Sequence, residues 1–299
     1  MNLMSKYLVI YNGSAGSNDN EKIAHHFQRQ ATAHGDADLL ATQSRQEALQ
    51  AIQKRAKDYD CLVTIGGDGT LNTTCTALLK ANVGTTLGII PGGTVNNFAK
   101  ALGLPLEADA AIDTILTGTA RPVDLGYLPD TGQAIVSSLT IGKLAETAQN
   151  VKQSEKKCWG PMIYLFKGFK QLVTNRSYKF RLTVNDQTHV QRAQVILITT
   201  TNSVGGFITF NQEASFDDDL LHTFVLRRFT PRKLMNYGRL FIARKFKNAR
   251  GVSYFKSTSL TIENLSHRPL HTRIDGDPSV KLPIKVAIRS DFIQVMTPN

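Results

Sequence analysis

The chain has few cysteines, a single tryptophan and no long apolar run. Its 299 residues include three Cys, and no two of them form a CxxC pair. This pattern excludes a disulfide framework and a structural zinc site of the usual spacing. The apolar runs are far shorter than the roughly 20 residues of a membrane-spanning helix, and residues 1–6 lack the pattern of a signal peptide. We therefore expect a soluble, cytoplasmic protein with a globular core.

Acidic residues are scarce in the second part of the chain. Residues 1–125 contain 10 Lys/Arg and 12 Asp/Glu, whereas residues 126–299 contain 25 and 12. Between Leu220 and Ile262 there are ten basic residues, interleaved with aromatic ones, and no acidic residue. Such a span suits an anionic membrane surface or single-stranded nucleic acid, and it also suits an ordinary solvated face. The charge pattern alone does not decide among these.

Strand and helix patterns alternate over the first third of the chain. The predicted strands are Tyr7–Tyr11, Ala37–Thr42, Cys61–Ile65 and Leu87–Ile90, and the predicted helices are Asn18–His34, Gln46–Lys57, Leu71–Lys80, Val95–Leu102 and Ala108–Leu116. Strands that alternate with helices indicate a mostly parallel sheet covered on both faces. We therefore predict an α/β fold class, with a three-layer α/β domain over residues 1–127.

Short β segments dominate the rest of the chain. The predicted strands are Ala134–Ile141, Tyr178–Val184, Ala193–Thr201, Leu221–Leu226, Ser259–Ile262, Lys285–Ile288 and Phe292–Met296, with helical insertions at Pro161–Thr174 and Pro231–Arg244. Turn signals such as Asn-Asp and Asp-Gly-Asp separate them. We predict a C-terminal antiparallel β-sandwich domain over residues 128–299, and leave open that its tail packs back on the first domain.

A glycine loop, Gly66–Thr70, lies directly between a buried strand and a helix. Its three glycines permit close backbone approach, and Asp68 lies between them, where a structural turn needs no acid. Thr70 is placed to cap the following helix. N–H groups at such a junction can face an anion, which suits a polyphosphate. Asp68 is therefore a candidate to bind a metal or to take part in proton transfer.

A second glycine loop follows within thirty residues, again between a strand and a helix. Here Gly93, Thr94 and Asn96 lie beside the predicted helix start. Ligands of parallel sheets bind beyond the carboxyl ends of the strands, so both loops are expected at one edge. The chain has no GxxxxGK[ST] motif, and the first loop lacks the last glycine of GxGxxG. Neither a P-loop ATPase nor a Rossmann dehydrogenase is indicated.

The two loops together resemble the diacylglycerol kinase catalytic family. The resemblance lies in Gly-Gly-Asp-Gly-Thr followed by Pro-x-Gly-Thr-x-Asn-x-Phe-Ala. It extends to five further segments: Asn12–Gly16, Val123–Gly126, Asn202–Phe207, Ala214–Leu221 and Ile274–Pro278. The family includes bacterial lipid kinases, sphingosine kinases and ceramide kinases. NAD kinases and phosphofructokinases share the first loop more distantly.

The resemblance implies a role for each matching position. The residues implied to contact ATP are Asn12, Thr42, Gly66, Gly67, Asp68, Gly69, Thr70, Asn72, Gly93, Thr94 and Asn96. Asp68 and Asp124 would hold Mg²⁺ at the phosphates, while Ser215, Asp218 and the Leu220 carbonyl would match a second, structural magnesium site. Asp277, or else Asp275, would act as general base.

The chain departs from the family pattern at four of these places. Gly13 replaces a proline, Asn97 an aspartate, Asp219 a glycine and Asp277 a glutamate. A late Asp-Gly-Asp is also an ordinary hairpin turn. The structural metal site and the base are therefore the two implied features most in question.

The resemblance implies an ATP- and Mg²⁺-dependent lipid kinase, with diacylglycerol as the first candidate acceptor. Its partners would be a lipid with a free hydroxyl and an anionic membrane surface, with no nucleic acid, and family members often form homodimers. The acceptor chains are expected near Trp159–Phe169, although that stretch also suits an ordinary core helix. Two alternatives remain: an NAD kinase, and a non-catalytic protein that binds nucleotide and membrane on the same scaffold.

Overall fold

The computed structural model describes residues 5–13, 18–142, 177–203, 211, 213–227, 230, 237, 240, 245–266 and 268–299, except for the side chain of Asn18. The predicted helix at 161–174 and the acceptor stretch 159–169 lie outside these residues. Most of the predicted helix at 231–244 does so as well.

The described chain divides into two compact units, and the division does not follow the sequence order. The first unit holds residues 1–125, 131–136 and 289–299, and the second holds residues 126–130 and 137–288. The chain therefore passes between the units several times.

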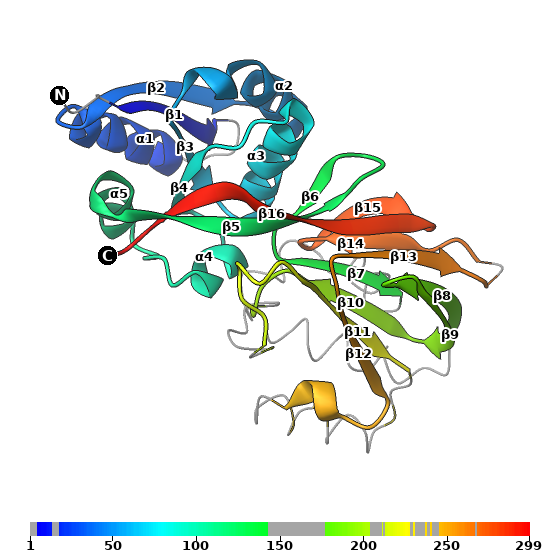
Figure 1. The fold of residues 1–299 in the computed structure, drawn as a ribbon. Coiled ribbons are helices and arrows are strands. Elements are labelled where there is room, and N and C mark those ends of the chain that lie inside the picture. The colour runs from blue at the N-terminus through cyan, green and yellow to red at the C-terminus, as the bar shows by residue number, and fades with distance from the viewer. Residues whose placement is uncertain are drawn as a thin grey trace. The chain divides into compact units, whose positions relative to one another are not determined.

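The first unit is built on a parallel sheet (Figure 1). Its strands are β1 (Ser5–Asn12), β2 (Gly35–Thr42), β3 (Cys61–Gly66) and β4 (Thr86–Pro91), in the order β2-β1-β3-β4. The last residues of β16 (Ile284–Thr297) continue the sheet, because Gln294 and Val295 pair in parallel with β4. β5 (Thr119–Leu128) pairs with β16 and with the short β6 (Gln133–Ile135).

Helices cover both faces of this sheet, as the alternating pattern predicts. They are α1 (Asn18–Ala31), α2 (Arg45–Arg55), α3 (Asp68–Ala81), α4 (Asn97–Ala101) and α5 (Ala108–Thr117). Alternate residues of β1 and β3 pack with α1 and α5 in one core, in which Tyr7 meets Phe27 edge to face at 5.4 Å between ring centroids. Since side chains of a strand alternate between the faces, Leu8 and Ile10 lie on the other face and are fully buried as well. The prediction of a three-layer α/β domain is confirmed.

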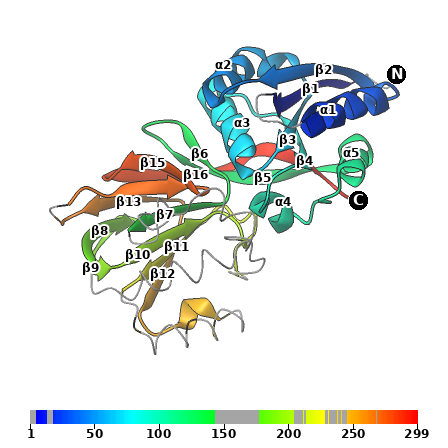
Figure 2. The same cartoon turned by 180° about the vertical axis from the view of Figure 1, so that it is seen from behind.

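The second unit is antiparallel (Figure 2). Its strands are β7 (Ser138–Gly142), β8 (Tyr178–Val184), β9 (Gln187–Ala193), β10 (Val195–Thr199), β11 (Leu221–Leu226), β12 (Val252–Ser257), β13 (Ser259–Asn264), β14 (His271–Ile274) and β15 (Asp277–Lys281). One sheet has the order β12-β11-β10-β7-β14-β15, and the first residues of β16 pair with β13, which is followed by β8 and β9. Every residue of β10 and β11 is buried, so both faces of that sheet are covered at its centre.

Two hairpins of the second unit use two-residue turns with positive φ. Asn185 and Asp186 connect β8 to β9 with φ of 48° and 62°. Asp275 and Gly276 connect β14 to β15 with φ of 50° and 93°. Asn, Asp and Gly are the residues that adopt this left-handed backbone most readily. The hairpin interpretation of the late Asp-Gly-Asp is therefore confirmed.

Several predicted element boundaries are wrong. The segment Ala134–Ile141 forms two strands, and the two segments predicted within 285–296 form one. Helix α3 begins at Asp68 with Gly67 as its N-cap, so Thr70 lies inside the first turn and does not cap the helix. Among the strands in the described part of the chain, five were not predicted: β5, β9, β12, β14 and β15.

Candidate functional site

The carboxyl ends of the four parallel strands bring the predicted loops to one edge of the first unit. Strand register places Asn12 opposite Thr42 and Gly66 opposite Pro91, while Tyr11 lies opposite Ile65. Both glycine loops therefore begin at the same edge as Asn12. This is the edge at which parallel α/β sheets bind their ligands.

The two glycine loops contact each other through their backbones. The Gly92 N–H donates to the Gly66 carbonyl at 2.8 Å. A Cβ built on Gly93 would lie 2.6 Å from the Gly67 Cα and 2.7 Å from the Asn96 Oδ1. The loops can approach this closely only because neither Gly67 nor Gly93 has a side chain.

Asp68 connects the two loops through its carboxylate. Its Oδ2 accepts a hydrogen bond from the Asn97 N–H at 3.1 Å, and its Oδ1 accepts one from the Phe98 N–H at 3.3 Å. These N–H groups belong to the first turn of α4, where no intrahelical acceptor exists for them. Asp68 thus holds the start of one helix while its own backbone starts another. This contact was not predicted from the sequence.

Asn96 holds the second loop in shape. It adopts a left-handed backbone with φ of 52°. Its Oδ1 accepts from the Gly93 N–H at 3.0 Å, and its Nδ2 donates to the Gly93 carbonyl at 2.9 Å. Thr94 lies between them and is exposed, as is Gly69 of the first loop. Of the second loop's predicted contacts, Gly93 and Thr94 are exposed, whereas Asn96 is half-buried.

Two predicted ATP contacts are buried within the fold. Thr42 donates to the Tyr11 carbonyl at 3.2 Å. Asn72 is 3% exposed; its Oδ1 accepts from Arg45 Nη2 at 2.7 Å and its Nδ2 donates to the Ala134 carbonyl at 2.8 Å. These bonds attach β6 and α2 to α3. Asn72 therefore supports the helix that begins at the first loop, rather than lying at the surface of that loop.

Asp124, on β5, is buried at 4% exposure and belongs to the same unit as Asp68. Its Oδ1 accepts from the Asp291 N–H at 3.1 Å. Mg²⁺ prefers oxygen ligands and is often bound by one or two carboxylates together with substrate phosphates. Asp68 and Asp124 supply such oxygens, so their chemistry fits the implied magnesium.

The loop predicted as a structural metal site is held by hydrogen bonds of the protein itself. Asp218 accepts from the Ser215 N–H at 3.0 Å and the Leu220 N–H at 3.1 Å, and its Oδ2 lies 2.8 Å from the His222 Nε2. The next residue, Asp219, adopts the left-handed backbone with φ of 61°. The carboxylate of the predicted donor set thus has three protein partners, and the structural metal site stays a prediction.

A buried histidine, which sequence reasoning missed, continues this hydrogen-bonded network. The His222 Nδ1 lies 2.6 Å from the Tyr254 hydroxyl, which accepts from the Asn211 Nδ2 at 3.4 Å. Burial raises the pKa of Asp218, but the hydrogen bonds from His222, Ser215 and Leu220 outweigh it, so the pKa lies below its ordinary value. The sequence signal that could have identified this residue is a lone histidine within a predicted strand, residues 221–226, that is otherwise largely apolar.

The two acids of the late motif differ in their surroundings. The Asp275 Oδ1 accepts from the N–H groups of Ser137 and Ser138, both at 2.8 Å. Asp277 begins β15 and is exposed. Both residues belong to the second unit, whereas the glycine loops belong to the first.

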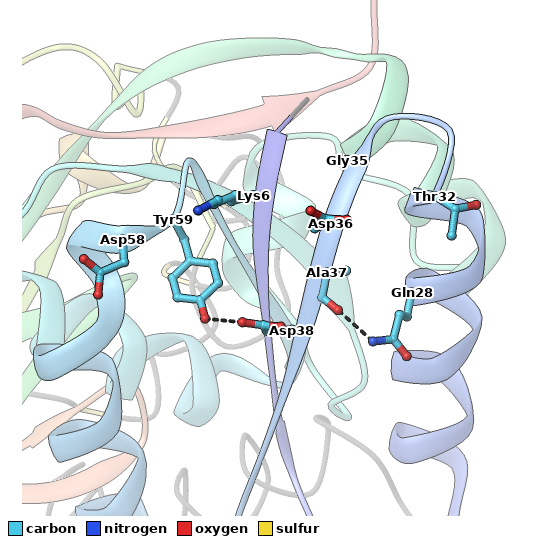
Figure 3. Close-up of a pocket in the computed structure, with 9 residues that line it drawn as sticks. All are labelled: Lys6, Gln28, Thr32, Gly35, Asp36, Ala37, Asp38, Asp58 and Tyr59. Atoms are coloured by element: carbon cyan, nitrogen blue, oxygen red, sulfur yellow. Dashed lines mark hydrogen bonds between the residues drawn. The ribbon is translucent and has the colours of Figure 1, made fainter. Parts of the chain in front are cut away.

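A cavity of ≈620 Å³ opens at the other edge of the first unit's sheet (Figure 3). Lys6 and Gly35, near the amino ends of β1 and β2, line it together with Gln28, Asp38 and Tyr59. The Tyr59 hydroxyl donates to Asp38, and the Gln28 Nε2 donates to the Ala37 carbonyl at 2.7 Å. Both contacts are drawn in Figure 3. None of the predicted site residues lines this cavity.

Neither a membrane-spanning helix nor a cluster of metal-ligating side chains occurs among the described residues. Among the helices that the structure describes, none combines the length and the apolar composition that crossing a bilayer requires. Within the same described ranges, no group of three or more His, Cys, Asp or Glu side chains is arranged to hold a metal ion.

Comparison with known families matches nearly the whole chain. Residues 6–128 match the family described as "Diacylglycerol kinase catalytic domain". Residues 137–297 match the family described as "YegS C-terminal NAD kinase beta sandwich-like domain".

Individual relatives agree with these matches. The chain is 28% identical to a diacylglycerol kinase of Bacillus subtilis, over 99% of this chain and 97% of the relative. It is 29% identical to one from Staphylococcus saprophyticus, over 84% and 81%. A crystal structure of a diacylglycerol kinase from Bacillus anthracis superposes with a TM-score of 0.80 at 22% identity, covering 98% and 97% of the two chains. At that identity the structural likeness shows the fold alone.

Proposed function

Because the chain belongs to the diacylglycerol kinase catalytic-domain family, and is at that level a lipid kinase, we propose that it transfers the γ-phosphoryl group of ATP to the hydroxyl of diacylglycerol. The products are phosphatidic acid and ADP. The observation that carries the proposal is the pair of glycine loops, joined backbone to backbone with the Asp68 carboxylate between them.

The two loops suit a nucleotide because they combine exposed backbone with a helix start. Gly69 is exposed in the first turn of α3, a helix of 14 residues. N–H groups in such a turn, together with the helix dipole, favour phosphate oxygens. Asn12, Thr94 and four glycines, Gly66, Gly67, Gly69 and Gly93, are the residues we assign to ATP.

Phosphoryl transfer depends mainly on positioning and charge neutralisation. Mg²⁺, when bound, would supply positive charge that neutralises the negative charge developing on the phosphates. Asp68 and Asp124 are the residues that would hold it. Asp277 accepts the proton as the lipid oxygen forms its bond to phosphorus and the bond to ADP breaks. Its exposure leaves the carboxylate accessible to a substrate hydroxyl.

The test is a kinase assay with labelled ATP and mixed micelles of diacylglycerol, sphingosine, ceramide or undecaprenol. We expect phosphatidic acid to form, and Asp68→Ala to reduce turnover at least about 100-fold, since it removes a magnesium ligand and both bonds to α4. Asp36→Ala is the matched control, because Asp36 is an exposed acid at the amino edge of the same sheet. This control should retain wild-type turnover.

Two outcomes would replace the proposal. Formation of NADP from NAD and ATP, without lipid phosphorylation, would make the protein an NAD kinase. ATP binding without transfer to any acceptor of the panel would indicate a non-catalytic nucleotide-binding protein. Transfer to another lipid of the panel would keep the lipid kinase and change the acceptor.

A further inference from the structure

We propose that Asp275 is a positioning residue, which fixes the hairpin turn that presents Asp277, and is not itself the proton acceptor. The proposal rests on the proposed kinase function for its catalytic part. Its structural part concerns hydrogen bonds within the second unit.

The Asp275 carboxylate is hydrogen-bonded to the backbone of a neighbouring segment. One oxygen, Oδ1, accepts from two successive N–H groups, those of Ser137 and Ser138, each at 2.8 Å. A carboxylate oxygen that already accepts two backbone N–H bonds has less of its hydrogen-bonding capacity left for a substrate hydroxyl. Ser137 is fully buried, so its N–H has little access to water if the carboxylate is removed.

The same turn is attached to β7 by its own backbone. The Asp275 N–H donates to the Ser138 carbonyl at 2.8 Å, which continues the pairing of Ile274 with Leu139. Side chain and main chain of one residue thus bind the same dipeptide. The turn is fixed against the start of β7 at three points.

Asp277 follows this anchored turn directly. The register pairs Ile274 with Asp277, so only Asp275 and Gly276 separate the two strands. The Arg273 side chain donates from Nε to the Gly276 carbonyl at 2.9 Å, which fixes the far side of the turn. With the turn held on both sides, the position of the exposed Asp277 carboxylate depends on the Asp275 contacts.

The backbone angle and the hydrogen bonds of the turn explain why Asp occupies position 275. The residue must accept a left-handed φ of 50° and offer an oxygen to two N–H groups. Asn satisfies both requirements and removes only the charge, whereas Gly satisfies the first alone. Asn and Gly variants therefore separate anchoring from proton transfer.

The experiment compares Asp275→Asn, Asp275→Gly and Asp277→Asn in the lipid kinase assay. We expect Asp275→Asn to stay within about threefold of the wild-type kcat. Asp275→Gly should lower kcat about 10- to 100-fold through misplacement of Asp277, with the KM for ATP little changed because the glycine loops belong to the other unit. Asp277→Asn should lower kcat at least about 100-fold and remove the acid limb of the pH profile.

The opposite pattern would overturn the proposal. If Asp275→Asn is as inactive as Asp275→Gly and loses the acid limb, while Asp277→Asn keeps it, then Asp275 is the base.

A second readout does not depend on activity. Amide hydrogen exchange, followed by NMR, should speed up at Ser137 and Ser138 in Asp275→Gly and remain slow in Asp275→Asn. Unchanged exchange in the Gly variant would disprove the anchor. If the wild-type protein phosphorylates no lipid, the proposed function fails, and exchange still decides whether Asp275 anchors the turn.

Discussion

At the scale of single residues, the acids of this chain differ mainly in which N–H groups they already bind. Asp68 accepts from Asn97 and Phe98, and Asp275 accepts from Ser137 and Ser138. The sequence could predict an acid after a strand, because that depends on local pattern. It could not predict these partners, which lie 29 or more residues away along the chain and meet only when the sheets form.

Asp218 gives a prediction at this scale, because its pKa is lowered in the folded state. The charged form of Asp218 stabilises the fold at pH values above the pKa of the unfolded state, near 3.8. This stabilisation is lost as the pH falls through the lower pKa of the folded state. Asp218→Asn should therefore cost about 1–3 kcal/mol of unfolding free energy at pH 7, and progressively less below pH 4. Urea unfolding at pH 7, 5 and 3 measures this difference.

The control for this prediction is Asp130→Asn, an exposed acid of the same unit, which should have no effect at any of these pH values. A cost of Asp218→Asn that stays constant from pH 7 to pH 3 would show that the charge of Asp218 does not stabilise the fold.

At the scale of elements, pattern predicted the strands whose burial is regular. β8 alternates between buried and open positions and β11 is wholly apolar except for His222 and Thr223, and both have the predicted bounds. β9 was missed because its residues are mostly polar and exposed. β16 was predicted as two strands because the polar residues 289–291 interrupt its apolar pattern, at the point where it passes from one unit to the other.

The contact between the glycine loops gives a prediction for these elements. Gly93→Ala should destabilise the first unit by about 1–3 kcal/mol, because the new Cβ would lie 2.6 Å from the Gly67 Cα. It should also weaken ATP binding, since the loops must separate. Gly92→Ala is the matched control, because its Cβ would approach no closer than 3.3 Å to the Gly66 Cα. Thermal unfolding and ATP titration of both variants measure these effects. An equal loss of stability and of ATP affinity in the two variants would contradict this account.

At the scale of the whole molecule, positive charge is concentrated in residues 126–299. Some of it is paired: Lys256 Nζ lies 3.0 Å from Glu213 Oε2, and Lys247 also contacts Glu213. Lys245 and Arg250, in the same basic span, are exposed. These two are the described residues that we expect to face an anionic membrane surface.

Vesicle binding tests that expectation. A basic residue near an anionic surface contributes about 1 kcal/mol, so Lys245→Gln with Arg250→Gln should weaken binding to phosphatidylserine vesicles about 30-fold at low salt. The control removes two exposed lysines of the first unit, Lys54→Gln with Lys57→Gln. It makes the same change in net charge. Equal losses in both variants would attribute binding to net charge and not to this surface.

The shared strand β16 has a consequence for synthesis on the ribosome. Its last residues pair with β4, and the Thr297 Oγ1 donates to the Thr119 carbonyl at 3.0 Å, yet they are translated only after residues 137–288. At about 5–20 residues per second, that interval lasts on the order of 10–30 s. Throughout it the nascent first unit leaves an edge of β4 without its final neighbour, and an open edge is a template for wrong pairing.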